Sequence, residues 1–197
     1  MVSQTNEQAL EAAIEKRLTG TSLEELKSST ASKHEVREEQ VPFGNHHGYR
    51  LGYPKDFNPQ YAINEVCFWA FLQNTQQEEL EKLQKASSDW QRKILERFDR
   101  LVKKYGLLYM LKKGLSVDDA FFNLMYPAPL ASSSDKVKQN FDSNIFSSTR
   151  QLRYSIENPL EEIDVVLFIN GLPFATLELK NPWTGQTARY HGQKQYR

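Results

Sequence analysis

The clearest hydrophobic pattern in the chain is a pair of short β-branched and aromatic runs on either side of an Asn-Gly dipeptide. Residues 163 to 169 are almost wholly apolar, Asn170-Gly171 favours a tight type I′ turn, and residues 173 to 179 form the second run. A continuous apolar run of this kind is typical of a strand that is covered on both faces. The sequence therefore predicts a β-hairpin whose first strand lies in the core.

Amphipathic helices account for much of the remaining pattern. A first helix is expected from about Asn6 to Leu18, with Thr5 as its cap, Gly20 as its stop and Leu10, Ile14 and Leu18 on its buried face. Three further helices are expected at 61–72, 76–85 and 90–104. The last of these has a basic face, for which a solvated role is favoured over contact with DNA phosphates.

Strand character returns at 119–126 and 146–156, whereas residues 28–58 are polar, contain three glycines and are expected to be irregular. Together these elements predict an α/β (α+β) domain. Its sheet is expected to be mixed and mostly antiparallel, flanked by helices, with the hairpin at its centre. The helices between about 58 and 114 are interpreted as an insertion in this core.

Three charged residues gather at the open end of the predicted hairpin. Folding at the turn places Asp164 across from Leu177 or Glu178, depending on whether a bulge is present, and Glu178 and Lys180 share one strand face. Two neighbouring carboxylates in a partly buried site repel each other unless a proton or cation lies between them, and oxygen ligands suit Mg²⁺, with Mn²⁺ as a substitute. We therefore expect a metal-dependent phosphodiesterase in which Asp164 and Glu178 bind the ion and Lys180 orients the attacking water. The simpler alternative is a surface charge pair.

Composition bounds the class of protein. The 197 residues are 39% hydrophobic and 12% aromatic, which predicts one globular domain over 1–197. Acidic and basic residues number 25 each, so the domain has no net field that attracts a polyanion, and DNA is expected to be held mainly by other domains or subunits. A single cysteine excludes an internal disulfide, and no apolar run is long enough to span a membrane or form a signal peptide. A cytoplasmic location is expected.

Several ordered motifs resemble a known family. Asp164 followed by Glu178-Leu179-Lys180 resembles the Asp…Glu-x-Lys signature of the PD-(D/E)xK nucleases. The surrounding sequence is similar to the restriction (R) subunit of type I restriction-modification enzymes, and the resemblance runs from about Asp56 onward. The motifs that carry it are Phe-Leu-Gln-Asn-Thr-Gln at 71–76, Thr-Arg-Gln-Leu-Arg-Tyr at 149–154, Asn-Gly-Leu-Pro at 170–173, Glu-Leu-Lys-Asn-Pro at 178–182, Thr-Gly-Gln-Thr at 184–187 and Gln-Tyr-Arg at 195–197.

The resemblance implies a PD-(D/E)xK restriction-endonuclease-like core and adds further site residues. Such nucleases commonly draw another metal-binding glutamate from a helix ahead of the core strands, and Glu11 is the candidate here, with a solvated helix face as the alternative. Members of this branch also carry a Gln-x-x-x-Tyr element after the lysine. Gln186 and Tyr190 fit that spacing literally, whereas the family resemblance favours Gln195 and Tyr196. Arg153 either approaches the DNA backbone or pairs with a nearby glutamate.

The resemblance also implies an endonuclease that hydrolyses double-stranded DNA after ATP-driven translocation, in a complex with modification and specificity subunits. ATP would act only through motor domains, and the chain contains no Gly-x-x-x-x-Gly-Lys-Ser/Thr loop, so it is expected to be an N-terminal part of a larger subunit. Two alternatives remain: a nuclease module of another helicase-nuclease, and a non-catalytic platform that contacts DNA or docks subunits.

Overall fold

The computed structural model describes residues 2–30 and 48–179, which form two compact units. The first unit contains the N-terminal segment to Lys55 together with Phe146–Leu167 and the chain from Ala175 onward. The second contains Asp56–Ile145 and Phe168–Phe174. Helices and a mixed sheet are both present, so the predicted α/β class is confirmed.

Four strands form the main sheet in the order β1-β6-β7-β8. They are β1 (Tyr49–Leu51), β6 (Phe146–Arg153), β7 (Glu162–Ile169) and β8 (Leu172–Leu177). Strand β1 runs parallel to β6, whereas the backbone hydrogen bond from Asn170 to Ile145 shows that the end of β7 meets the start of β6, as antiparallel strands do. The sheet is therefore mixed.

The predicted hairpin is present, but its place in the sheet differs from the prediction. Strand β7 is interior, whereas β8 is an edge strand among the strands that the structure describes. The reason is that β1 arises within the segment that was expected to be irregular and adds to the opposite side of the sheet. Three residues are too few to give a recognisable period-2 pattern.

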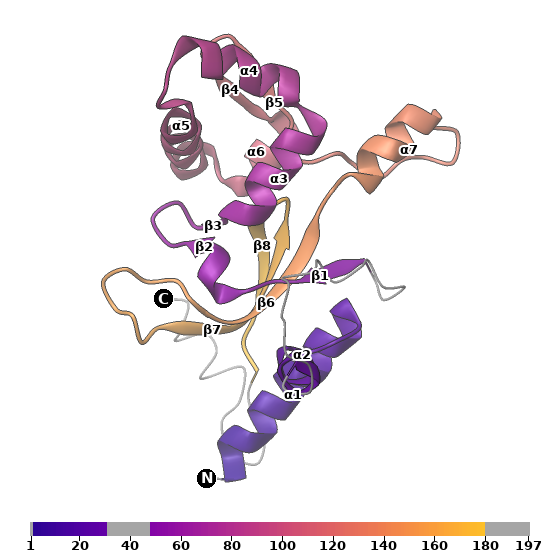
Figure 1. The fold of residues 1–197 in the computed structure, drawn as a ribbon, viewed down its shortest axis with the longest axis vertical. Coiled ribbons are helices and arrows are strands. Elements are labelled where there is room, and N and C mark those ends of the chain that lie inside the picture. The colour runs from indigo at the N-terminus through magenta and orange to yellow at the C-terminus, as the bar shows by residue number, and fades with distance from the viewer. Residues whose placement is uncertain (1, 31–47, 180–197) are drawn as a thin grey trace. The chain divides into compact units, whose positions relative to one another are not determined.

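Helices α1 (Val2–Thr19) and α2 (Leu23–Thr30) belong to the first unit, and α1 packs against β1 and β6 (Figure 1). Helix α1 begins before Thr5, so the predicted cap is wrong, whereas the stop is confirmed by Gly20, which has a φ of 85°. Where the side chains of α1 are described, from Glu7 onward, Glu11, Glu15 and Thr19 are buried, Ile14 and Leu18 are half-buried, and Leu10 is exposed. The predicted apolar face is therefore wrong at Leu10 and is not the most buried face, because β6 presents a buried arginine to this helix.

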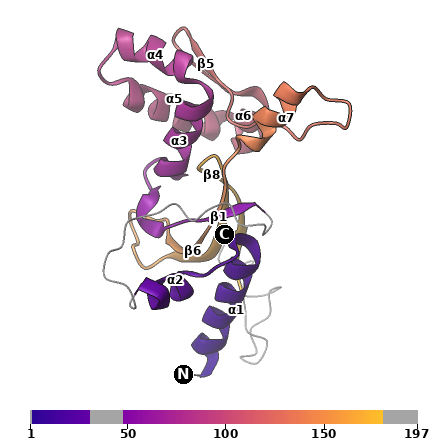
Figure 2. The same ribbon diagram turned by 45° about the vertical axis from the view of Figure 1, so that its right-hand side comes forward.

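The second unit is largely helical. Its helices are α3 (Glu65–Thr75), α4 (Gln77–Ala86), α5 (Trp90–Tyr105), α6 (Leu107–Lys113) and α7 (Asp135–Asp142). Helices α4 and α5 pack against the small hairpin of β4 (Leu115–Val117) and β5 (Ala120–Phe122), and Figure 2 shows both helices beside β5. A further short pair is β2 (Phe57–Asn58) and β3 (Ile63–Asn64). The predicted helices at 61–72, 76–85 and 90–104 are confirmed within a few residues. Strand β5 pairs with β4 in a separate sheet, so the expectation that it joins the main sheet is wrong.

The turn of the hairpin is fixed within the second unit by the side chain of Asn170. Both Asn170 and Gly171 have positive φ, at 51° and 79°, as a type I′ turn requires. The buried Asn170 amide accepts a hydrogen bond from Ile145 N at 2.7 Å and donates to Leu124 O and to Asn144 Oδ1, both at 2.9 Å. The turn is thus anchored by tertiary contacts as well as by local preference.

No helix within residues 2–30 or 48–179 has the length and apolar character that crossing a bilayer requires.

Candidate active site

Asp164 lies half-buried on β7, in the first unit, beside the chain that follows β8. Its Oδ2 accepts a hydrogen bond from the backbone N–H of Leu179, the residue between Glu178 and Lys180. Glu178 is also half-buried, while Lys180 lies outside the described residues. The predicted meeting of Asp164 with the Glu-x-Lys segment is therefore present as far as that segment is described.

Gln151 of β6 lies across from Asp164. Strands β6 and β7 are antiparallel, with Ile145 beside Asn170 at one end and Arg153 in contact with Glu162 at the other. Counting inward along both strands from either pair places Gln151 opposite Asp164. Gln151 has a φ of 50°, in the left-handed region that a non-glycine residue rarely adopts within a strand. Backbone conformations of this kind cost about 1–3 kcal/mol and persist where the surroundings hold them.

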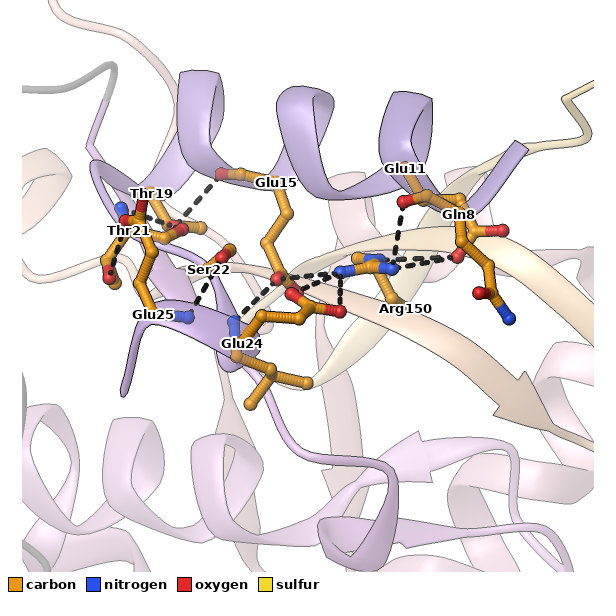
Figure 3. A network of polar contacts seen from close by, with 10 residues as sticks. Gln8, Glu11, Glu15, Thr19, Thr21, Ser22, Glu24, Glu25 and Arg150 are labelled. Atoms are coloured by element: carbon orange, nitrogen blue, oxygen red, sulfur yellow. Dashed lines mark hydrogen bonds and ion pairs between the residues drawn. The ribbon is translucent and has the colours of Figure 1, made fainter. Parts of the chain in front are cut away.

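A buried guanidinium next to this position joins β6 to both N-terminal helices (Figure 3). Arg150 donates to Glu11 Oε2 from Nε at 3.3 Å and from Nη2 at 3.2 Å. Its Nη1 donates to Glu15 Oε2 at 3.3 Å and to the two carboxylate oxygens of Glu24 at 2.9 and 3.0 Å, and its Nη2 donates to Gln8 O at 3.3 Å. One cation therefore forms hydrogen bonds with three carboxylates. Solvent hardly reaches the side chains of Arg150, Glu11 and Glu15.

The pKa of each of the two buried acids in this cluster lies above its ordinary value. Burial is the main cause that raises the pKa of Glu11 above its ordinary value. Arg150 and a hydrogen bond from Gln151 oppose the rise, and the charge of Asp164 adds to it. Burial likewise raises the pKa of Glu15, against a hydrogen bond from the Leu23 N–H and the charge of Arg150. Burial raises the pKa of Glu24 as well, but its backbone and Arg150 hydrogen bonds outweigh this, so the net shift is downward.

Glu11, the predicted third carboxylate, belongs to the same unit as Asp164, and the charge of Asp164 contributes to the raised pKa of Glu11. Its Oε2 is engaged by Arg150, so an ion at Asp164 would have to be met by Oε1. Within the part of the chain that the structure describes, no three His, Cys, Asp or Glu side chains lie close enough together to form a metal-binding group. The role of Glu11 as a ligand stays a prediction.

Arg153 is exposed and its Nε lies 3.6 Å from Glu162 Oε2, so the cross-strand pairing that was predicted as one alternative is present. The other candidate residues lie outside the described residues. They are Gln186, Tyr190, Gln195 and Tyr196.

Sequence reasoning did not predict that Arg150 binds Glu11, Glu15 and Glu24. Two features of the sequence pointed toward these residues. Glu11 and Glu15 are one turn apart and so share a helix face, and Arg150 lies inside the motif at 149–154. The sequence contains nothing that pairs the helix with the strand, because the partners are 135 and 139 residues apart.

The carboxylates of the hairpin suit a divalent cation in chemistry. Asp164 and Glu178 supply oxygen donors, and the hydrogen bond from Leu179 uses only part of the acceptor capacity of Asp164. Hard cations such as Mg²⁺ are bound in proteins by one or two carboxylates of this kind. The donor set therefore fits the ion that the sequence predicts.

Comparison with protein families connects this geometry to a known group. The sequence model of one protein family, the type I restriction enzyme R protein N terminus, matches residues 31–197, which is most of the chain. The chain belongs to this family. Membership of the type I restriction enzyme R protein N-terminus family identifies a nuclease region of a multi-subunit complex that acts on DNA. Helices α1 and α2 precede the matched residues. Comparison with curated proteins and with solved structures gave no match.

Proposed function

We propose that this chain is a metal-dependent endonuclease domain of the PD-(D/E)xK type, which hydrolyses phosphodiester bonds of double-stranded DNA. The observation that carries the proposal is the hydrogen bond from Leu179 to Asp164, which holds one carboxylate beside the residue that separates Glu178 and Lys180 in the sequence. Membership of the R-subunit family supports the same reading. Placing a carboxylate in a half-buried site costs solvation free energy, which supports a functional role for Asp164.

In this proposal, Asp164 and Glu178 hold Mg²⁺, with Mn²⁺ as a substitute. The bound ion supplies Lewis-acid stabilisation of charge on the phosphate and a lowered pKa for water. Lys180 directs the attacking water or offsets negative charge that grows on the phosphoryl oxygens. Glu11 would supply the third carboxylate, while Arg150 and Gln151 restrain its side chain.

We infer the partners of this domain from the family to which it belongs. The domain would act after ATP-driven translocation by motor domains and together with modification and specificity subunits. Either Gln186 with Tyr190 or Gln195 with Tyr196 would support the site against DNA. The match to the R-subunit family favours this reading over a nuclease module of another helicase-nuclease.

A plasmid-nicking assay tests the catalytic roles. The 197-residue chain is incubated with supercoiled plasmid at low salt and Mn²⁺, and we expect nicking that EDTA abolishes. Asp164→Asn and Lys180→Ala should each reduce nicking at least about 100-fold, the scale on which a single positioned group contributes to catalysis. Glu162→Gln is the matched control from the same strand and should retain activity. Nicking that is absent in the parent chain, or equal in all variants, would count against catalysis and favour a non-catalytic platform.

A further inference from the structure

The end of α5 and helix α6, which contact each other within the second unit, carry a strongly basic set of exposed side chains although the whole chain is neutral. We call the exposed side chains between residues 100 and 113 the Lys-Tyr corner. Residues 100 to 113 contain one arginine, four lysines and no acidic residue, which gives a formal charge of +5 in a chain whose net charge is zero. The exposed members of the corner are Arg100, Lys103, Lys104, Tyr105, Leu108, Tyr109, Lys112 and Lys113.

The charges of this corner differ from those earlier on α5. There, Arg92 is paired with Asp89 at 2.7 Å and with Glu96 at 3.3 Å, and Lys93 lies 3.4 Å from Asp118. In the corner, Lys103 is paired with Asp99 at 2.7 Å. Within the described residues, no carboxylate forms an ion pair with Arg100, Lys104, Lys112 or Lys113. Neighbouring groups therefore neutralise the first half of the helix but leave most of the corner charged.

Two tyrosine rings lie exposed among these lysines. Tyr105 and Tyr109 stack with ring centroids 5.0 Å apart and 29° between their planes, and each is 46% exposed. Lys104 Nζ lies 4.9 Å from the centroid of the Tyr105 ring. Stacking and the cation–π contact restrain these side chains, so the aromatic surface is ordered although it is not part of the core.

From this combination we propose that the Lys-Tyr corner is a second DNA-contacting surface, which binds the phosphate backbone beside the tyrosines. Lysine and tyrosine side chains both make backbone contacts to DNA, and exposed aromatic rings between basic residues also suit unpaired bases. Protein–protein interfaces, in contrast, are depleted in lysine, so a protein partner fits this surface less well. The inference takes from the proposed function only that DNA is the substrate, and it does not depend on hydrolysis.

Binding is measured by fluorescence anisotropy with a labelled single strand and with the duplex of the same sequence. EDTA is present throughout, so a failure of the metal site does not affect the result. The parent chain should bind at low salt, with an affinity that falls as salt rises. Lys112→Glu/Lys113→Glu should weaken binding at least about tenfold and lower the salt slope by about 1.4–1.8, because each lost phosphate contact contributes about 0.7–0.9. A Tyr109→Ala effect confined to the single strand would add base stacking to the backbone contact.

The matched control is Lys85→Glu/Lys136→Glu, which makes the same change in net charge at two exposed lysines of α4 and α7. We expect it to weaken binding much less than the change at the corner. Equal losses in the two double variants would show that only net charge matters and would overturn the proposal. Unchanged DNA binding after the substitutions at the corner would also overturn it and would leave a protein partner as the occupant.

Discussion

At the scale of single residues, the most consequential feature is a buried arginine that is shared by three glutamates. Ion pairs of this kind are stabilising only if every charge keeps a partner, because removing a carboxylate from water costs several kcal/mol. Arg150 can neutralise only one unit of negative charge among Glu11, Glu15 and Glu24. Burial raises the pKa of each of the two most buried acids above its ordinary value, and this single arginine offsets the rise only in part.

A pH dependence of stability follows. A carboxyl group with a raised pKa in the folded state binds more protons folded than unfolded between the ordinary and the raised value. The free energy of unfolding therefore falls as pH rises through that window, by up to about 1.4 kcal/mol per pH unit for each proton. Glu15→Gln removes the Glu15 part of this slope. The stability of the variant relative to the parent chain should therefore rise with pH from the ordinary glutamate pKa to the raised pKa of Glu15, and then level off.

Urea unfolding at a series of pH values checks this prediction, with Glu157→Gln, an exposed glutamate of the loop after β6, as the control. The control should parallel the parent chain. If the difference between Glu15→Gln and the parent does not change with pH, the buried acid does not titrate as argued.

At the scale of elements, the hairpin turn combines a local preference with a close tertiary approach. A Cβ at Gly171 would lie 2.3 Å from Asn64 O and 2.7 Å from Phe68 N, and the residue has a φ of 79°. Neither backbone atom can move without disturbing β3 or α3. Glycine is therefore required here both for the conformation and for the space.

Gly171→Ala should lower the free energy of unfolding by about 2–4 kcal/mol, the sum of a left-handed backbone penalty and overpacking. Chemical denaturation measures the loss. Gly48→Ala is the control, since Gly48 also has positive φ but a Cβ there would meet nothing within 4 Å, and only the backbone penalty of about 1–2 kcal/mol is expected. Equal losses at the two glycines would refute the packing argument.

The elements that sequence predicted well are those whose signal is local. Asn170-Gly171 between two apolar runs specifies a hairpin within about 20 residues of chain, and Trp90, Ile94 and Phe98 set the core side of α5 by helical spacing. The buried face of α1 could not be predicted in this way. Its buried glutamates accept hydrogen bonds from Arg150, and that arginine is distant in sequence.

The same limit applied to strands and to the site. Strand β1 is short and takes its place by pairing with β6, which no local pattern specifies. The meeting of Asp164 with the Glu178 segment could be predicted because both are in one hairpin. The positive φ of Gln151 and its bond to Glu11 depend on neighbours in space, so the residues around the hairpin had no signal of their own.

At the scale of the whole molecule, the family match and the hairpin geometry support one account. Residues 31–197 match the R-subunit nuclease region, and within them Asp164 accepts a hydrogen bond from Leu179. Helices α1 and α2 lie before the matched residues, yet among the residues that the structure describes they supply the carboxylates that contact Arg150. They are therefore expected to act as part of the folded first unit rather than as a separate appendage.

The central claim is that Asp164 and Glu178 together bind a divalent cation. Calorimetric titration of the chain with Mn²⁺ tests it directly, with Asp164→Asn and Glu178→Gln as the site variants and Glu162→Gln as the control from the same hairpin. We predict one site in the parent and control, and a loss of at least about tenfold in affinity, or about 1.4 kcal/mol, in each site variant. Equal Mn²⁺ affinity in all four proteins, or no binding by the parent chain, would contradict the account.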